Sequence, residues 1–167
     1  ANQSPFAMQV HSPDGTLIYA NPAWGKLWKL RDYKRFYGVF NVLEDGQSKK
    51  IGIGKAFRRA LSGKTVRLSA LSFNPRHSRI PGRKRWLNAV IYPLFDHAGH
   101  INNIVIVLED ISERMQTEEA LKTSESLFRQ VWESSFDGMR LLDREGKRLV
   151  VNDSFCWIRG VYRENLI

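Results

Sequence analysis

The sequence has little cysteine, no long apolar run and no acidic excess, and these absences exclude several classes of protein. A single cysteine, Cys156, excludes a disulfide framework and a zinc site built on cysteines. No segment reaches the length of about 18 apolar residues that a membrane-spanning helix needs. The first residues do not have the pattern of a secretory signal. We therefore expect a protein of a reducing, cytoplasmic compartment.

What the 167 residues do contain is typical of a folded chain. Hydrophobic residues make up 43% and charged residues 26% of the sequence, which excludes wholesale disorder. The formal net charge is +9, and basic residues gather at 26–35, 49–59 and 76–85. The last of these stretches carries a proline and a glycine, which predict a loop. No nucleic-acid-binding motif accompanies the charge, so nucleic acid is not an expected partner, while contact with an acidic partner or a membrane surface stays open.

Apolar periodicity predicts two strands, then several helices, then three more strands. The first two strands form a hairpin over 6–20, and Asn21 and Pro22 begin a helix as cap and first residue. A basic amphipathic helix is expected over 51–61. The three later strands are expected at 64–70, 85–95 and 101–108. The fold class is therefore α+β, a five-stranded antiparallel sheet with helices inserted between strands 2 and 3.

Asp110 marks the start of a segment of different character. Residues 110–113 fit a capping box, in which Asp110 accepts from the first turn and Glu113 reaches back. Asp110 and Arg114 have the spacing of ion-pair partners on a helix. A charged helix with one apolar side is expected over 111–133. It predicts coiled-coil-like packing in a homodimer.

The sequence repeats itself with an offset of 131 residues. The matching pairs are Met8 and Met139, Val10 and Leu141, Ile18 and Leu149, Asn21 and Asn152, and Trp24 and Phe155. The second copy contains one hairpin and one helix before the sequence stops. We therefore expect 134–167 to be the start of a second domain, and the chain to be a piece of a longer protein.

The order and spacing of these features resemble the PAS sensor domains with their PAC-type C-terminal halves. The resemblance is carried by Asp14-Gly15, Asn21-Pro22-Ala23, 41–45, Arg85-Trp86-Leu87, 96–99 and 110–114. It implies a PAS/PAC sensor domain over 1–110, a linker helix over 111–133 and the N-terminal part of a second, truncated PAS domain over 134–167.

The resemblance also implies a role for the motif that follows the last strand. In this family an Asp and an Arg pair where the final strand meets the output helix. The matching positions are Asp110 and Arg114, and Ser112 stands where the family usually has Thr. Signal transfer is therefore assigned to Asp110, Ile111, Ser112 and Arg114. A plain helix cap is the alternative interpretation of the same residues.

The resemblance implies a pocket between the sheet and the central helices, but the residues do not favour haem or flavin as its cofactor. The helix over 49–61 has no histidine to serve as an axial ligand, and Cys156 does not lie in the motif of the flavin photosensors. His97 and His100 share a turn without a third metal ligand, so no metal is expected. The segment 52–55 lacks the first glycine and the hydroxyl of a phosphate loop. We expect no catalysis in this chain.

Ligand-binding candidates come from the alternation of the strand over 85–95. Trp86, Asn88 and Tyr92 share one face of it. Asn41 and Phe57, from the helical region, could close over them. Both faces of the strand are apolar, so the pattern leaves open which face points inward and whether the interior is a filled core.

Two hypotheses for the function follow. The first is a regulatory fragment that senses a small organic ligand and transmits the signal through the C-terminal helix to an effector in the same chain. The resemblance implies a sensor histidine kinase of a two-component system as the parent. The alternative is a ligand-free PAS dimerisation module of a diguanylate cyclase or another effector, which the doubly apolar strand over 101–108 supports.

Overall fold

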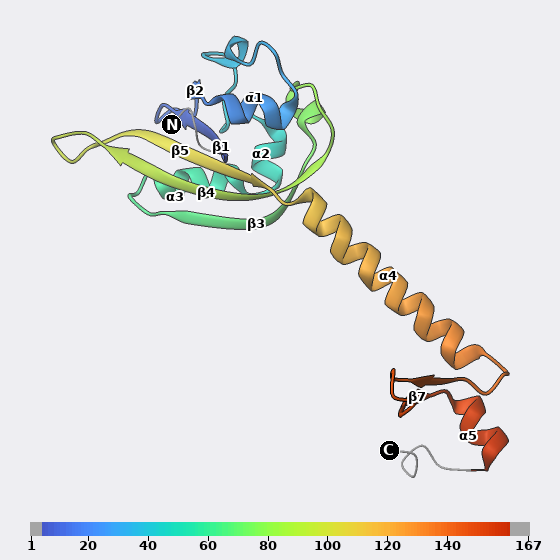
Figure 1. Ribbon diagram of the computed structural model, residues 1–167. Coiled ribbons are helices and arrows are strands. Elements are labelled where there is room, and N and C mark those ends of the chain that lie inside the picture. Colours follow the sequence, from blue (N-terminus) through green and yellow to red (C-terminus); the bar gives the residue numbers. More distant parts are fainter. Residues whose placement is uncertain (1–4, 161–167) are drawn as a thin grey trace. The chain divides into compact units, whose positions relative to one another are not determined.

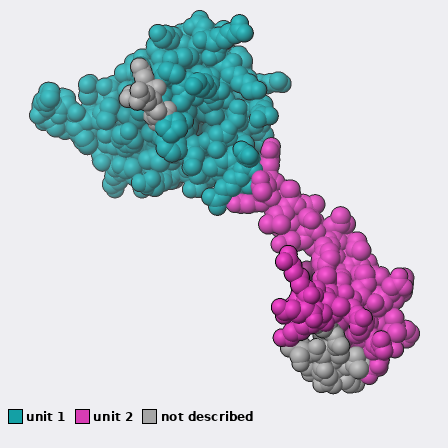
Figure 2. Space-filling view, in the orientation of Figure 1, with its two compact units in different colours: residues 1–115 teal, residues 116–167 magenta. Residues whose placement is uncertain are grey.

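The structure is a computed structural model that describes residues 5–160 (Figure 1). The chain divides into two compact units, residues 1–115 and 116–167 (Figure 2). The predicted first and last domains include residues 1–4 and 161–167, and these parts lie outside the described residues.

Unit 1 is built on a five-stranded antiparallel sheet with the strand order β2-β1-β5-β4-β3. The strands are β1 (Ala7–His11), β2 (Leu17–Ala20), β3 (Val66–Phe73), β4 (Arg85–Phe95) and β5 (Ile101–Asp110). The N-terminal hairpin pairs with β5, the last strand of the unit, so the hairpin and the end of the unit lie side by side in the sheet. The predicted α+β class with five antiparallel strands is confirmed.

Between β2 and β3 the chain forms the helices that pack against one face of the sheet (Figure 1). They are α1 (Pro22–Trp28), the short 3-10 helix η1 (Lys34–Phe36), α2 (Gly46–Lys50) and α3 (Ile53–Ala60), and a second 3-10 helix, η2 (Pro75–Ser78), follows β3. Asn21 caps α1 as predicted, because its side chain accepts from the N–H of Trp24. The helix predicted over 51–61 starts two residues later than expected, at Ile53 of α3. Gly52 has φ +90°, which separates α2 from α3.

The core of unit 1 lies between these helices and the sheet. Trp24 and Phe57 come from the helices and meet Leu87, Ile91 and Ile106 of the sheet, all nearly or fully inaccessible to solvent. Each such side chain stabilises the fold by about 1.5–3 kcal/mol through burial.

The long helix predicted after the sheet is α4 (Ser112–Ser134), with 23 residues. It begins directly after β5. Within the described range the helices, α4 included, lack the combination of length and apolar character that a bilayer crossing requires.

Unit 2 contains the rest of α4, a two-stranded hairpin and one helix. These elements are β6 (Arg140–Leu142), β7 (Arg148–Val151) and α5 (Asp153–Arg159). In its described part, the buried side chains are those of Trp132, Val151 and Asn152. Trp132 stacks on Phe128 of the same helix with 5.6 Å between the ring centroids. The unit therefore has only a small core of its own.

Candidate functional site

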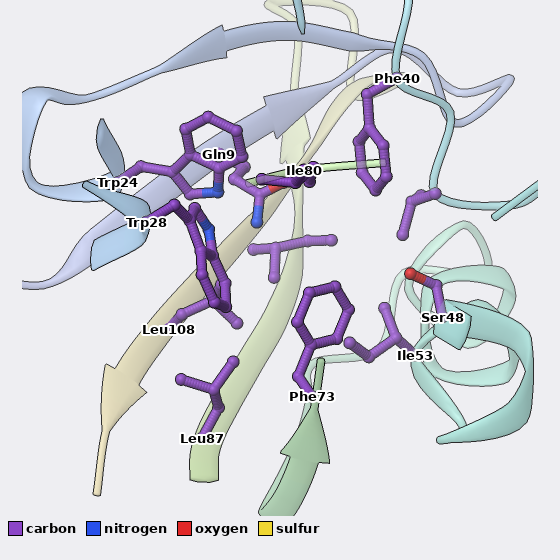
Figure 3. A pocket seen from close by; sticks show the side chains of 12 residues that line it. Gln9, Trp24, Trp28, Phe40, Ser48, Ile53, Phe73, Ile80, Leu87 and Leu108 are labelled. Carbon is purple, nitrogen blue, oxygen red and sulfur yellow. The ribbon is translucent and has the colours of Figure 1, made fainter. Parts of the chain in front are cut away.

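A small cavity lies between the helices and the sheet of unit 1 (Figure 3). Its volume is about 20 Å³, which is room for about one water molecule. It is lined by Gln9, Trp24, Trp28, Phe40, Val42, Ser48, Ile53, Phe73, Ile80, Leu87, Ile106 and Leu108. The interior is nearly filled in this conformation, so an organic ligand needs some of these side chains to move.

Two tryptophans bring hydrogen-bond donors to the cavity. Trp24 and Trp28 are one turn apart on α1 and only 1% and 2% exposed. Neither indole Nε1 has an acceptor among the described residues. Both side chains line the cavity, and Figure 3 shows their nitrogens on the side where Gln9 lies. A buried donor without a partner costs about 1–3 kcal/mol, so the cavity holds hydrogen-bonding capacity that the protein does not use itself.

Gln9 connects the cavity to a buried histidine. His11 is fully buried, and this burial lowers the pKa of its imidazole from 6.5 to about 4, so the ring is neutral. Its Nδ1 lies 2.9 Å from the carbonyl oxygen of Gly15 and must therefore carry the proton. Nε2 is then an acceptor, 3.1 Å from the Gln9 amide oxygen. The bond forms when the amide turns its NH₂ group to the ring, and its oxygen then faces away from His11.

The structure decides which face of β4 points inward. Leu87, Ala89 and Ile91 are buried, and Leu87 lines the cavity. The half-buried residues on the opposite face are Trp86, Asn88, Val90 and Tyr92. Trp86, Asn88 and Tyr92, the ligand-binding candidates of this strand, thus lie on the face opposite the cavity. The sequence could not separate the faces, because both are apolar on this inner strand.

The Asn88 side chain forms hydrogen bonds within the sheet. Its amide oxygen accepts from the N–H of Ala70 at 3.1 Å, and its nitrogen donates to the Glu109 carboxylate at 2.9 Å. Ala70 has φ +52° and lies in a β-bulge of β3 between Leu68 and Leu71. The Asn88 side chain thus fixes an irregular point of the sheet.

Asn41 and Phe57 do not line the cavity either. The Asn41 amide donates to the carbonyl of Asp14 at 3.0 Å and accepts from the N–H of Leu43 at 2.9 Å, so it holds the turn of the β1–β2 hairpin. Phe57 is fully buried and packs edge-on against His11, with ring centroids 5.8 Å apart. It belongs to the core beside the cavity.

Two consecutive residues of β4 hold the junction between β5 and α4. The guanidinium of Arg85 forms an ion pair with the Asp110 carboxylate. The N–H of Trp86 donates to the Ser112 hydroxyl at 2.9 Å, and its carbonyl accepts from the N–H of Ile111 at 2.9 Å. Asp110 also accepts from the N–H of Ser112 at 3.0 Å. We refer to the contacts of these five residues as the junction clamp.

Three of the four predicted signal-transfer residues, Asp110, Ile111 and Ser112, take part in this clamp. Helical spacing predicts Arg114 as a partner of Asp110, and the structure shows an ion pair of Asp110 with Arg85. Arg85 lies 25 positions earlier, and only the pairing of β4 with β5 brings it to the end of the sheet. A helical spacing rule cannot find such a contact.

The structure places the other motifs considered in the sequence in a turn and in two helices. His100 lies 3.7 Å from Asp96 in the β4–β5 turn. Within residues 5–160, no group of three or more His, Cys, Asp or Glu side chains is arranged to hold a metal ion. Of the segment 52–55, Gly52 lies between α2 and α3, and the other three residues begin α3. Cys156 is half-buried in α5.

Comparison with known proteins supplies the family. A family model described as the PAS fold matches residues 1–116. No curated protein matches the chain.

Solved structures share the fold at low sequence identity. An RNA-binding light-oxygen-voltage receptor is 22% identical with a TM-score of 0.56, and the match covers 78% of this chain and 36% of that one. The VqmA dimer of Vibrio cholerae in the absence of target DNA is 19% identical with a TM-score of 0.52, covering 68% and 49%. VqmA bound to DPO is 16% identical with a TM-score of 0.52, covering 99% and 70%.

These likenesses show the fold alone, and the chain spans about a third to a half of the first two structures. The names of both mention a nucleic acid. The sequence-based expectation that nucleic acid is not a partner therefore has no support from the relatives.

Proposed function

Because the chain belongs to the PAS fold family, we propose that unit 1 is the ligand-sensing part of a larger signalling protein. A small organic molecule binds in the cavity between the helices and the sheet, and the signal leaves through the junction clamp into α4. The parent is a cytoplasmic sensor histidine kinase whose effector lies in the same chain. Residues 134–167 are the start of a second PAS domain, and α4 is the linker that pairs two chains as a homodimer.

The observation that carries this proposal is the position of Leu87. Its side chain lines the cavity, and the two residues before it, Arg85 and Trp86, hold the junction clamp. Two residues of a strand span roughly 7 Å. A ligand that displaces Leu87 therefore moves the groups that fix Asp110 and Ser112. An ion pair and hydrogen bonds that are either made or broken are a suitable two-state element for such a signal.

Native mass spectrometry of the purified chain, with an absorption spectrum of the same sample, tests the proposal. We expect a dimer that carries a reproducible added mass. Leu87→Ala should lower the fraction of the protein that carries the added mass. Tyr92→Ala, on the outer face of the same strand, should leave that fraction unchanged. An equal loss with both variants, or a response of the parent that survives Asp110→Ala, contradicts the proposal.

The second candidate is a dimerisation module without a ligand, in a diguanylate cyclase or another effector. Two observations favour it: the cavity measures only about 20 Å³, and α4 carries large apolar side chains that are 55–60% exposed. These are Leu121, Leu127, Phe128 and Val131. A dimer with no added mass and no absorption in the visible range is the result expected of this candidate.

A further inference from the structure

Resting on the proposed function, we propose that the cavity selects a compact, uncharged molecule that accepts hydrogen bonds, through a carbonyl oxygen or an aromatic ring nitrogen. The acceptor binds the indole N–H groups of Trp24 and Trp28. The argument uses the balance of donors and acceptors, the absence of charge in the lining, and the space available.

Among the described residues that line the cavity, the side-chain N and O atoms left without a hydrogen bond are both donors, and the Gln9 amide and the Ser48 hydroxyl are the other polar groups of the lining. The Nε1 atoms of Trp24 and Trp28 are two buried donors without an acceptor among the described residues. Gln9 does not change this balance. With its NH₂ group toward His11 it offers the cavity one oxygen for two donors, and in the opposite orientation it adds further donors. A ligand that supplies acceptors removes the cost of the unpaired N–H groups, and a purely apolar one does not.

The lining carries no compensating charge. None of the described residues that line the cavity is Lys, Arg, Asp or Glu. The titratable group that contacts Gln9 is His11, which burial keeps neutral. A carboxylate placed here would lose its hydration without gaining a cation, which costs far more than two hydrogen bonds return. The cavity therefore favours neutral acceptors over anions of the same shape.

The space sets the size of the ligand. About 20 Å³ admits no organic molecule until a side chain moves. Ile80 is the lining residue that comes from the loop between β3 and β4, and it is 2% exposed. Its N–H donates to the carbonyl of Pro75 within the same loop. Because Ile80 belongs to a loop rather than to the sheet, its side chain can move without breaking the strand pairing, and the volume of one such side chain limits the ligand to a few heavy atoms.

Selectivity is expected from this arrangement. A site that offers hydrogen bonds rejects an isosteric analogue without the acceptor, because its own polar groups are then left unpaired. Acetone, acetate and isobutene share one branched skeleton of four heavy atoms and differ in their hydrogen-bond acceptor. Acetone carries a neutral acceptor, acetate a charged one, and isobutene none.

The test is a titration of the ¹⁵N-labelled chain with these three probes, followed by the indole N–H signals of its five tryptophans. It is done on the wild type and on Ile80→Ala, which enlarges the cavity. Trp24→Phe and Trp28→Phe assign the two signals of interest, and Trp86→Phe, on the outer face of β4, is the matched control. We expect acetone to shift the Trp24 and Trp28 signals saturably, with acetate and isobutene binding roughly tenfold more weakly.

The outcomes separate this inference from the proposed function. Weaker acetone binding by Trp24→Phe or Trp28→Phe, but not by Trp86→Phe, supports the inference. Equal binding of acetone and isobutene overturns it and leaves a ligand-binding cavity in place, and preferred binding of acetate does the same. If no probe shifts either signal, even in Ile80→Ala, the cavity takes no ligand, and the proposed sensor function fails with it.

Discussion

Asn21 and Asn152 occupy equivalent places in the two units and make three equivalent side-chain hydrogen bonds. The amide oxygen of Asn21 accepts from the N–H of Met8 at 2.9 Å and from that of Trp24 at 3.0 Å. Its nitrogen donates to the carbonyl of Phe6 at 2.9 Å. One buried side chain thus ties the hairpin to the start of α1.

The same bonds recur in unit 2 with an offset of 131 residues. The amide oxygen of Asn152 accepts from the N–H groups of Met139 and Phe155 at 2.8 and 2.9 Å. Its nitrogen donates to the carbonyl of Asp137 at 2.9 Å and also to that of Trp132 at 3.1 Å. This agreement in bonding supports our proposal that residues 134–167 begin a second PAS domain.

Removing either asparagine side chain should destabilise its own unit. In Asn21→Ala, the backbone groups of Phe6, Met8 and Trp24 lose their hydrogen bonds to this side chain, and we expect the free energy of unfolding of unit 1 to fall by about 2–4 kcal/mol. Asn152→Ala should accelerate amide exchange in the β6–β7 hairpin and leave unit 1 unchanged. Urea denaturation and hydrogen exchange measure both effects. Asn102→Ala, at an exposed position of β5, is the control and should cost less than about 0.5 kcal/mol. A similar loss in the control would contradict the assigned role.

The parts of the fold that depend on neighbours in the sequence could be predicted. The hairpin, the Asn21 cap and the long helix follow from short-range rules, since a turn, a cap or a helical period involves residues only a few positions apart. The repeat could be found because the Asn152 environment is copied at a constant offset.

The candidate site depends on contacts between residues far apart in the sequence, and short-range rules do not predict these contacts. Arg85 meets Asp110 only through the β4–β5 register. Ile80 is buried although its loop is mostly polar and basic, because the loop folds this side chain into the core. Trp24 and Trp28 have the i, i+4 spacing of one helix face, and the available signal for the cavity is that this face carries two indole donors, which an ordinary core residue such as leucine would not bring.

The bulge at Ala70 should respond to glycine with a gain in stability. Ala70 has φ +52°, a left-handed conformation that costs a residue with a Cβ about 1–2 kcal/mol. Ala70→Gly relieves this cost and loses some of the gain to the greater freedom of the unfolded chain, so we expect a net increase of about 0.5–1 kcal/mol. Ser69→Gly, one residue earlier in the same strand, should instead lower stability by a similar amount. Thermal unfolding measures whether each variant is more or less stable than the wild type. A loss of stability with Ala70→Gly would contradict the strain at this position.

His11 should make unit 1 sensitive to mild acid. Its pKa is lowered from 6.5 to about 4 by burial in the folded chain, so between these values the unfolded state binds the proton and the folded state does not. Stability is therefore complete above about pH 6.5 and falls as the pH decreases toward 4, by about 3 kcal/mol in total. Urea denaturation across this range gives the free energy of unfolding of the wild type and of His11→Gln at each pH. The difference between the two is the contribution of His11. A difference that does not change with pH would show that His11 is not held neutral.

The last prediction concerns the junction clamp. The side chains of Arg85 and Asp110 are 11% and 29% exposed, so their ion pair is partly shielded from water. Asp110→Asn removes the charge and keeps an oxygen for the N–H of Ser112, while Arg85→Met removes the cation and keeps most of the chain length. We expect each change to lower stability by about 1–2 kcal/mol and to speed exchange of the Ile111 amide roughly tenfold.

The double variant decides whether the two residues act together. If the pair is the interaction that matters, Arg85→Met combined with Asp110→Asn costs no more than either change alone. Glu109→Gln is the control, because this neighbouring carboxylate bonds to Asn88 and the amide keeps that acceptor. Losses of stability that add up in the double variant would show that the ion pair does not connect the cavity to α4. Exchange of the Ile111 amide at the wild-type rate in both single variants would show the same. That result would leave the backbone of Trp86 as the remaining link, since its bonds to Ile111 and Ser112 need neither charged side chain.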